Sequence, residues 1–268
     1  MEIVKEMSNS DYRAREGLSS SDIKMLLENP YKYKIGYKKP KSENLALGSA
    51  VHSLILEPEN FKRDFLIMPD LNLRTKEGKE EKAKLEYEAE SSGKILIKDE
   101  SYKKALDIVD NFKQRSVFDM FKNGVAEVSF FSEINGIKCK ARPDYFIQDK
   151  GIILDLKTTS QENGASPDNF LKAIANFKYY IQAKWYMLLT GAKEFYFVVL
   201  ETESPYMLGV YELDKVSLDF AEKEILRAFE VFRNLDKFQS IFLDNLDYSK
   251  VQTLTLPNYV YYQKGAEF

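Results

Sequence analysis

The feature that most constrains this chain is a change in its hydrophobic pattern at Val125. Residues 125–134 and 137–147 are strand-like, and the Asn135-Gly136 pair between them is the strongest short signal for a β-hairpin turn. Further along the chain we expect strands over 151–158 and 194–201, with helices over 167–177 and 179–189 between them. This β-β-β-α-β order predicts an α/β fold in which helices flank a central mixed sheet.

Helical spacing dominates the residues before Val125. The other expected elements are a helix from the Ser20 or Ser21 cap to Pro30, helices over 45–56, 102–112 and 217–238, and a strand over 207–213. Residues 71–93 are rich in Lys and Glu, which predicts a solvated helix or a mobile arm that adds little to the core.

The chain contains no internal repeat and no linker rich in Pro, Gly or Ser, so we expect one domain over residues 1–268. Its expected parts are a mostly helical N-terminal extension over about 1–122, a catalytic α/β core over about 123–238 and a C-terminal tail over about 239–268.

Composition excludes several classes of protein. The chain has 39 Lys and Arg against 42 Asp and Glu, a net charge of −3, so it is not a histone-like polyanion binder and any contact with nucleic acid must be local. Cys139 is the only cysteine, which excludes disulfides, a cysteine-rich zinc site and a four-cysteine iron–sulfur cluster. No apolar run is long enough to cross a membrane, and we expect a soluble cytoplasmic protein.

Charged residues interrupt two of the expected strands. Strand alternation places Ile137, Cys139 and Ala141 on one face of the second hairpin strand, and Lys138, Lys140, Arg142 and Asp144 on the other. On the following strand, Asp155 and Lys157 lie opposite the apolar Ile152, Leu154 and Leu156. Buried charges are costly, and Asp144 adds a second carboxylate on a neighbouring strand. The two aspartates therefore imply a divalent cation.

A site with Asp144, Asp155, the Leu156 carbonyl and Lys157 favours a hard ion, Mg²⁺ or Mn²⁺, over zinc. Such an ion suits phosphodiester hydrolysis, with Lys157 orienting or deprotonating the attacking water. The alternative is that Asp155 and Lys157 form a plain surface ion pair at the end of a strand.

Arg142-Pro143-Asp144 and Asp155-Leu156-Lys157 together resemble the PD-(D/E)xK nuclease signature, with ten residues between the two aspartates. Gly48-Ser49-Ala50-Val51-His52 resembles the GxxxH helix of the RecB-like branch, and Gln182-Ala183-Lys184-Trp185-Tyr186 resembles its QxxxY helix.

The resemblance implies a restriction-endonuclease-like core in which His52 is a metal ligand. It also implies that Gln182 and Tyr186 contact DNA or brace the site, and that Glu127 is a further acidic catalytic residue. Without the resemblance, His52 could be a satisfied core histidine, and Gln182 and Tyr186 could belong to the solvated face of an amphipathic helix.

Within this superfamily, the segments 18–23 and 29–33 resemble the opening of the exonuclease VIII (RecE) type of phage recombination exonuclease. That type implies 5′ to 3′ degradation of linear double-stranded DNA, leaving 3′ single-stranded tails for a RecT-like annealing partner. It also implies a ring-shaped homo-oligomer, with a tetramer as the first possibility and a trimer as the second, in the cytoplasm of a bacterial host. Two alternatives remain: a catalytically inactive DNA-binding or interaction module of the same fold, and a site-specific endonuclease.

Two groups of cations could bind the phosphates of DNA. Lys138, Lys140 and Arg142 share a strand face with Asp144, which predicts that they lie beside the scissile phosphate. The Tyr-interleaved lysines between residues 32 and 41 could also contact phosphates, or could form a solvated loop.

Overall fold

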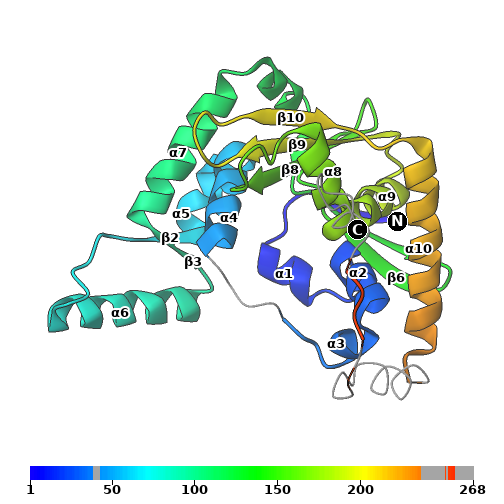
Figure 1. The fold of residues 1–268 in the computed structure, drawn as a ribbon, viewed down its shortest axis with the longest axis horizontal. Coiled ribbons are helices and arrows are strands. Elements are labelled where there is room, and N and C mark those ends of the chain that lie inside the picture. Colours follow the sequence, from blue (N-terminus) through cyan, green and yellow to red (C-terminus); the bar gives the residue numbers. More distant parts are fainter. Residues whose placement is uncertain (39–42, 237–250, 252, 257–268) are drawn as a thin grey trace, which may run out of the picture.

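The computed structural model describes residues 1–38, 43–236, 251 and 253–256. Its centre is a five-stranded mixed sheet with the order β10-β9-β8-β7-β4 (Figure 1). The strands are β4 (Val125–Ala126), β7 (Tyr145–Ile147), β8 (Ile152–Thr159), β9 (Glu194–Glu201) and β10 (Leu208–Tyr211). Strands β8 and β9 are parallel, and the other neighbours are antiparallel. The predicted α/β fold with a mixed central sheet is confirmed.

A second, antiparallel sheet carries the predicted hairpin. It contains β1 (Glu2–Val4), β5 (Ser129–Ile134) and β6 (Ile137–Ala141) in the order β1-β5-β6. Asn135 and Gly136 join β5 to β6 with φ angles of 53° and 75°, the left-handed conformations that a two-residue type I′ turn needs. The predicted position of the turn is therefore confirmed.

The two hairpin strands are shorter than the sequence pattern predicts, because each is interrupted near the acidic residues. Glu127 adopts a left-handed φ of 52° between β4 and β5, and Arg142-Pro143-Asp144 separates β6 from β7. Pro143 has no N–H to donate to a ladder, which favours a break there. The Glu127 N–H donates to the Asp144 carbonyl at 3.1 Å, so the two breaks face each other. Each strand passes from one sheet to the other at this point.

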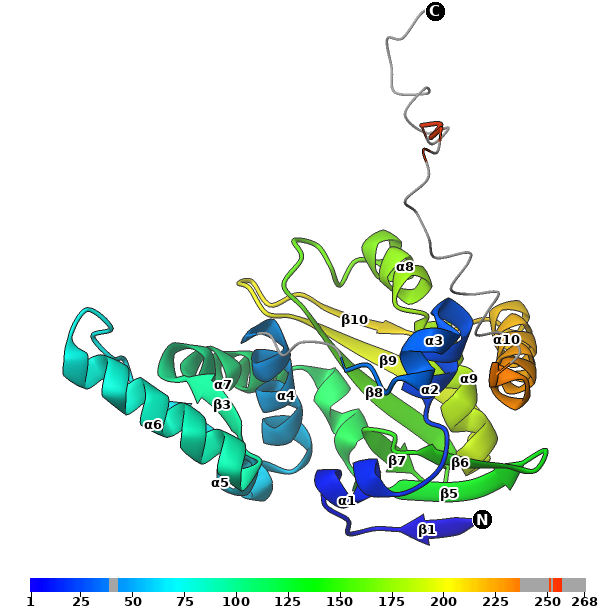
Figure 2. The same cartoon turned by 90° about the horizontal axis from the view of Figure 1, so that it is seen from below.

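Helices cover one face of the central sheet and pack around an apolar core. They are α2 (Ser20–Glu28), α8 (Pro167–Asn176), α9 (Tyr179–Thr190) and α10 (Lys215–Arg233), and Figure 2 shows α2, α9 and α10 side by side. Helix α2 begins with a capping box between Ser19 and Asp22. Trp185 of α9 is fully buried in this core, and its Nε1–H donates to the Lys140 carbonyl at 3.0 Å. This bond fastens α9 to the end of β6, just before Arg142.

The opposite face is covered by α4 (Glu43–Leu56) and α7 (Asp99–Lys113), which pack on Leu156, Val198 and Leu200 of the sheet. Beside them lie the short α5 (Phe61–Asp64) and a two-stranded parallel sheet, β2 (Phe65–Met68) with β3 (Ile95–Lys98). The sequence pattern did not predict this strand pair. Helix α6 (Lys76–Ser92) joins the two strands and extends from the body in Figure 1; it buries only Gly78 and Ala89, as a solvated helix does.

The remaining short elements are α1 (Asn9–Ala14), α3 (Pro30–Lys34) and the 3₁₀ turns η1 (Pro58–Asn60) and η2 (Ser116–Phe121). The end of the helix expected over 217–238 and most of the tail expected over 239–268 lie outside the described residues. In the part of the chain that the structure describes, we find no helix with the length and apolar character needed to span a membrane.

Candidate active site

Asp155 lies fully buried in the middle of the central sheet, where β8 faces α9. Gln182 of α9 donates from Nε2 to Asp155 Oδ1 at 2.9 Å, and the Lys157 ammonium pairs with Oδ2. Lys157 lies two residues further along the same strand face, so strand alternation brings both charged side chains to one place. Gln182 and Lys157 together fix both oxygens of the Asp155 carboxylate.

Asp144 reaches the same place from the strand next to β8. It precedes β7, which pairs antiparallel with β8, and its Oδ2 accepts the N–H of Leu156 at 2.7 Å. From the other face of the sheet, His52 of α4 brings Nδ1 to 3.5 Å from the same oxygen. The structure therefore brings together five side chains from four separate segments of the chain: His52, Asp144, Asp155 with Lys157, and Gln182.

Gly48 allows helix α4 to approach the sheet at this point. A Cβ at Gly48 would lie 2.8 Å from Thr158 Oγ1, closer than van der Waals contact permits. Because Gly48 and His52 are four residues apart, they lie on the same helical face. The small residue thus sets the distance at which His52 reaches Asp144.

Burial disfavours the charged form of each ionisable group in the site and so shifts the pKa values of the aspartates and of His52. It raises the pKa of Asp155 to about 6, despite the opposing effect of the Lys157 ammonium, and the Asp144 carboxylate adds to this rise. Burial also raises the pKa of Asp144. For Lys157, burial alone would lower the pKa, but the two carboxylates outweigh it and the net shift is upward, so the side chain stays cationic. Burial and the Lys157 charge lower the pKa of His52 to about 4, which leaves a neutral imidazole at pH 7.

These groups match the donor set of a divalent metal site. A neutral imidazole nitrogen, two buried carboxylates and the Leu156 carbonyl can ligate a divalent cation, and two like charges held in a buried place are stabilised by a dication. Among the described residues, no three His, Cys, Asp or Glu side chains already surround a common point as metal ligands do. At Asp155 the reason is visible, because Lys157 and Gln182 hold its oxygens.

Glu127 lies next to Asp144, whose carbonyl accepts the Glu127 N–H at 3.1 Å. Its side chain is half-buried, and its Oε2 is 4.0 Å from Arg142 Nε. Burial and the nearby Asp144 carboxylate raise the pKa of Glu127 to about 8, although Arg142 opposes the shift. Glu127 therefore releases its proton less readily than an exposed glutamate.

Arg142 and Lys140 do not face an open surface, which corrects the expectation of a free charged face beside Asp144. The N-terminal residues cover both side chains, and Tyr12 lies with its ring 4.4 Å from Arg142 Cζ. Arg142 donates from Nε to Ser129 Oγ at 2.8 Å and from Nη2 to the Met7 carbonyl at 3.0 Å. Strand alternation correctly places these cations opposite the apolar face, but it cannot show that another segment covers them.

Lys140 is held by the end of α1. Its Nζ donates to the carbonyls of Tyr12 and Arg13 at 3.2 Å each, and also to the carbonyl of Arg15. Lys138, by contrast, is exposed and pairs with Glu16 at 2.6 Å. Of the three cations predicted on this strand face, Lys138 alone presents its side chain to solvent.

Tyr186 lies inside the protein, behind Gln182. Its side chain is buried and packs on Phe195 with ring centroids 6.4 Å apart. The resemblance implied that Tyr186 either contacts DNA or braces the site, and a buried side chain fits the second role. In the basic segment, Lys32 and Lys34 lie on α3 and Lys38 is exposed, whereas Lys39 and Lys41 fall outside the described residues.

Two tyrosines near the site were not singled out from the sequence. Tyr179 lies under the Lys157 ammonium, 5.0 Å from Nζ to the ring centroid, and Tyr12 covers Arg142. A signal for Tyr179 existed, because it lies three residues before Gln182 and so on the same face of the helix. Tyr12 had no such signal, since it is more than a hundred residues from the strand that it covers.

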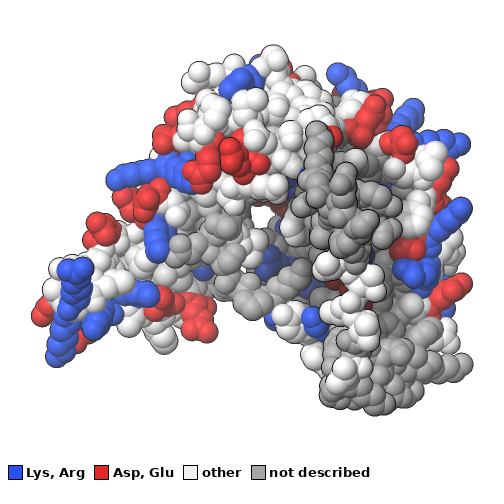
Figure 3. Space-filling view, in the orientation of Figure 1, with Lys and Arg blue, Asp and Glu red and all other residues white. Residues whose placement is uncertain are grey.

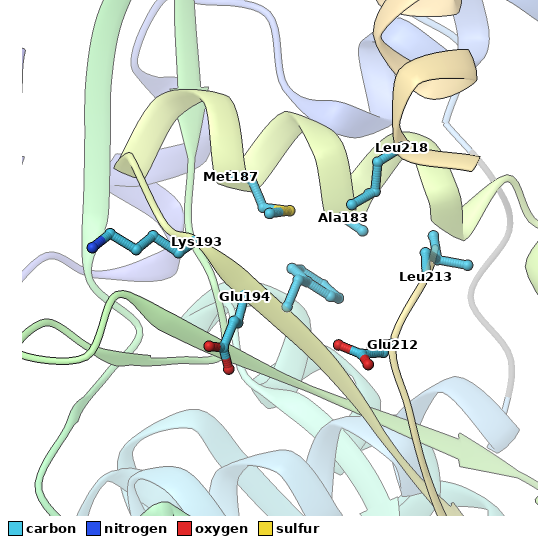
Figure 4. Close-up of a pocket in the computed structure, with 8 residues that line it drawn as sticks. Ala183, Met187, Lys193, Glu194, Glu212, Leu213 and Leu218 are labelled. Carbon is cyan, nitrogen blue, oxygen red and sulfur yellow. The ribbon is translucent and has the colours of Figure 1, made fainter. Parts of the chain in front are cut away.

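A small cavity of about 60 Å³ lies away from these residues, between α9, β9 and α10 (Figure 4). Its lining mixes apolar side chains such as Met187 and Leu218 with Glu194 and Glu212. It includes none of the residues that hold Asp155, so it is separate from the candidate active site.

Comparison with known proteins agrees with this geometry. Residues 19–240 match a protein family described as "PDDEXK-like domain of unknown function (DUF3799)". No curated protein matches the chain. A crystal structure of a protein from Eubacterium rectale, provisionally named an exonuclease, is similar with a TM-score of 0.61 and 16% identity, covering 94% of this chain and 96% of the other. A phage-related exonuclease from Haemophilus somnus 129PT gives a TM-score of 0.34 at 11% identity, covering 84% of this chain and 98% of the other, too low to support an argument.

Proposed function

This chain belongs to the family of PDDEXK-like domains, and from that premise we propose that it hydrolyses phosphodiester bonds of DNA with the help of Mg²⁺ or Mn²⁺. The observation that carries the proposal is the meeting of Asp144, Asp155 and Lys157 in one buried place, with His52 beside them. A plain surface ion pair would not bury Asp155 completely or give it partners from both β8 and α9.

Each residue has a proposed role in the reaction. Asp144, Asp155, His52 and the Leu156 carbonyl would hold the metal, and Gln182 orients Asp155 through its 2.9 Å hydrogen bond. When bound, the ion supplies a Lewis acid that polarises the phosphodiester and acidifies water. Lys157 would orient or deprotonate the attacking water, or balance charge on the phosphoryl oxygens.

We propose in particular that the protein is an exodeoxyribonuclease that acts on linear double-stranded DNA. The E. rectale protein with the similar fold is named an exonuclease, and the motifs of this chain resemble those of the exonuclease VIII type. That resemblance also supports 5′ to 3′ polarity, 3′ single-stranded products, a RecT-like annealing partner in phage recombination and a bacterial cytoplasm as the place of action.

A ring-shaped homo-oligomer would explain how an acidic protein holds DNA. The net charge is −3, and Figure 3 shows Lys and Arg interspersed with Asp and Glu on the face in view, without one continuous basic stripe. A ring around the duplex retains its substrate by topology as well as by charge. We propose a tetramer, with a trimer as the second possibility.

The test compares one plasmid in three forms: closed circular, linearised, and linearised with label at either the 5′ or the 3′ end. An exonuclease degrades the linear forms, leaves the closed circle intact and, with 5′ to 3′ polarity, releases the 5′ label first. Discrete fragments from the closed circle would show a site-specific endonuclease. DNA binding without cleavage of any form, at any Mg²⁺ or Mn²⁺ concentration, would show an inactive binding module and would refute the proposal.

A further inference from the structure

A neighbour of Lys157 that the steps above leave out is the ring of Tyr179. The Lys157 Nζ lies 5.0 Å from the ring centroid, within the range of a cation–π interaction. Tyr179 is the first residue of α9 and precedes Gln182 by three positions, so both side chains project from one helical face. Helix α9 thus contacts both members of the Asp155–Lys157 pair, one through Gln182 and the other through Tyr179.

The ring is held firmly in its place. It packs against Phe170 and Phe197, with ring centroids 6.2 Å and 6.1 Å away. The preceding residue, Lys178, takes a left-handed φ of 50° and pairs with Glu28 of α2 at 2.6 Å, which fixes where the helix begins. Lys24 of α2 also approaches the Tyr179 ring, at 5.2 Å. A ring packed in this way can locate a flexible lysine.

A second contact for the Lys157 ammonium matters because its carboxylate partner, Asp155, is also proposed to bind the metal. Asp155 is a proposed metal ligand, so its Oδ2 cannot serve as the permanent anchor of the ammonium. The Tyr179 ring is independent of that carboxylate and meets a lysine side chain that is only 15% exposed. Cation–π attraction is strongest where water is excluded.

We propose that Tyr179 is a positioning residue of the nuclease reaction, whose ring holds the Lys157 ammonium over the reacting phosphate group. The proposal rests on the nuclease function proposed above. It assigns to Tyr179 no contact with the reacting atoms, and all of its effect passes through Lys157. The cation–π contact depends on the aromatic face of the ring. Phenylalanine at position 179 should therefore preserve the effect, and leucine should abolish it.

The first experiment measures the steady-state kinetics of Tyr179→Leu and Tyr179→Phe on linear duplex. We expect Tyr179→Leu to lower kcat about five- to thirtyfold, the span that corresponds to cation–π strength, with KM within twofold of wild type. Tyr179→Phe should keep most of the wild-type kcat. Tyr180→Leu is the matched control, because Tyr180 is the next aromatic on the helix and packs on Phe220, 5.7 Å away. Tyr180→Leu should lower the melting temperature about as much as Tyr179→Leu does and leave kcat unchanged.

A double-mutant cycle with Lys157→Gln then asks whether the effect passes through the lysine. In the Lys157→Gln background, Tyr179→Leu should lower the residual rate by less than twofold. If the two losses multiply, or if Tyr179→Phe is as slow as Tyr179→Leu, the proposal is wrong.

A spectroscopic measurement tests the same contact without any DNA cleavage. Reductive methylation with ¹³C-formaldehyde labels lysines and keeps their charge, and Lys157→Arg identifies the Lys157 signal. We expect the methyl signal of Lys157 to be shifted upfield by the Tyr179 ring, to stay shifted in Tyr179→Phe and to return to the ordinary position in Tyr179→Leu. An unshifted signal in an active wild-type enzyme would overturn the role of Tyr179 alone. A shifted signal in a protein that cuts no DNA would overturn the nuclease function and leave the contact intact.

Discussion

Replacing Lys140 by methionine tests whether the N-terminal segment or DNA is the partner of this cation. In the structure, Lys140 Nζ donates to the carbonyls of Tyr12, Arg13 and Arg15, and it lies 5.3 Å from the Tyr12 ring. A hydrogen bond from a charged donor contributes about 1.5–3 kcal/mol, and three bonds from one atom do not add fully. Methionine keeps the length of the side chain and removes all three bonds. We therefore expect Lys140→Met to lower the free energy of unfolding by about 2–4 kcal/mol.

The assay has two parts, urea unfolding and DNA binding at several salt concentrations with a chelator present to prevent cleavage. Lys138→Met is the matched control for stability, because Lys138 is exposed on the same strand and its ion pair with Glu16 contributes at most about 1 kcal/mol. The slope of log K against log salt should be the same for Lys140→Met and wild type. A slope reduced by about one, with stability unchanged, would show that Lys140 binds a phosphate and would refute the reasoning.

Three further substitutions or reactions test parts of the site. Gly48→Ala should destabilise the protein by about 1–3 kcal/mol, because the new Cβ meets Thr158 Oγ1, and Thr158→Ala in the same chain should restore part of the loss in thermal unfolding; an unaffected single variant would contradict the close approach. His52→Ala should weaken Mn²⁺ binding, measured by calorimetry without DNA, about tenfold or more while the melting temperature stays near that of wild type; lost stability with unchanged Mn²⁺ affinity would indicate a core histidine. Burial raises the pKa of the Cys139 thiol to about 11, so at pH 8 a disulfide reagent should label it only after unfolding, and rapid labelling of the native protein would contradict its buried position.

Much of the candidate site could be predicted from the sequence, because its signals are local. Asn135-Gly136 fixes the hairpin turn through its backbone preferences, and strand alternation places Asp155 and Lys157 on one face of β8. A separation of four residues likewise places Gly48 and His52 on one face of a helix. Together with the family motifs, these local rules were enough to anticipate which side chains meet.

The remainder depends on contacts between distant segments. Nothing near Lys140 in the sequence shows that α1 covers it, since its partners Tyr12 and Arg15 lie more than 120 residues away. The strand break at Glu127 was missed because the apolar pattern resumes directly after it. For the break at Arg142-Pro143-Asp144, Pro143 was a signal that the strand prediction did not use. The β2–β3 pair joins two four-residue strands across the length of α6, and short apolar segments carry little periodicity.

The most direct test of the central claim is cleavage of end-labelled linear duplex DNA by the wild-type protein and by Asp155→Asn, each with Mg²⁺ and with Mg²⁺ plus chelator. The account predicts cleavage by the wild type only when free Mg²⁺ is present. It predicts a loss of at least about a thousandfold in Asp155→Asn, because a neutral amide cannot offset the charge of a hard dication, while the variant still binds the duplex. Cleavage by Asp155→Asn at a near wild-type rate, or wild-type cleavage that survives the chelator, would contradict the assignment of Asp155 and its neighbours as the active site.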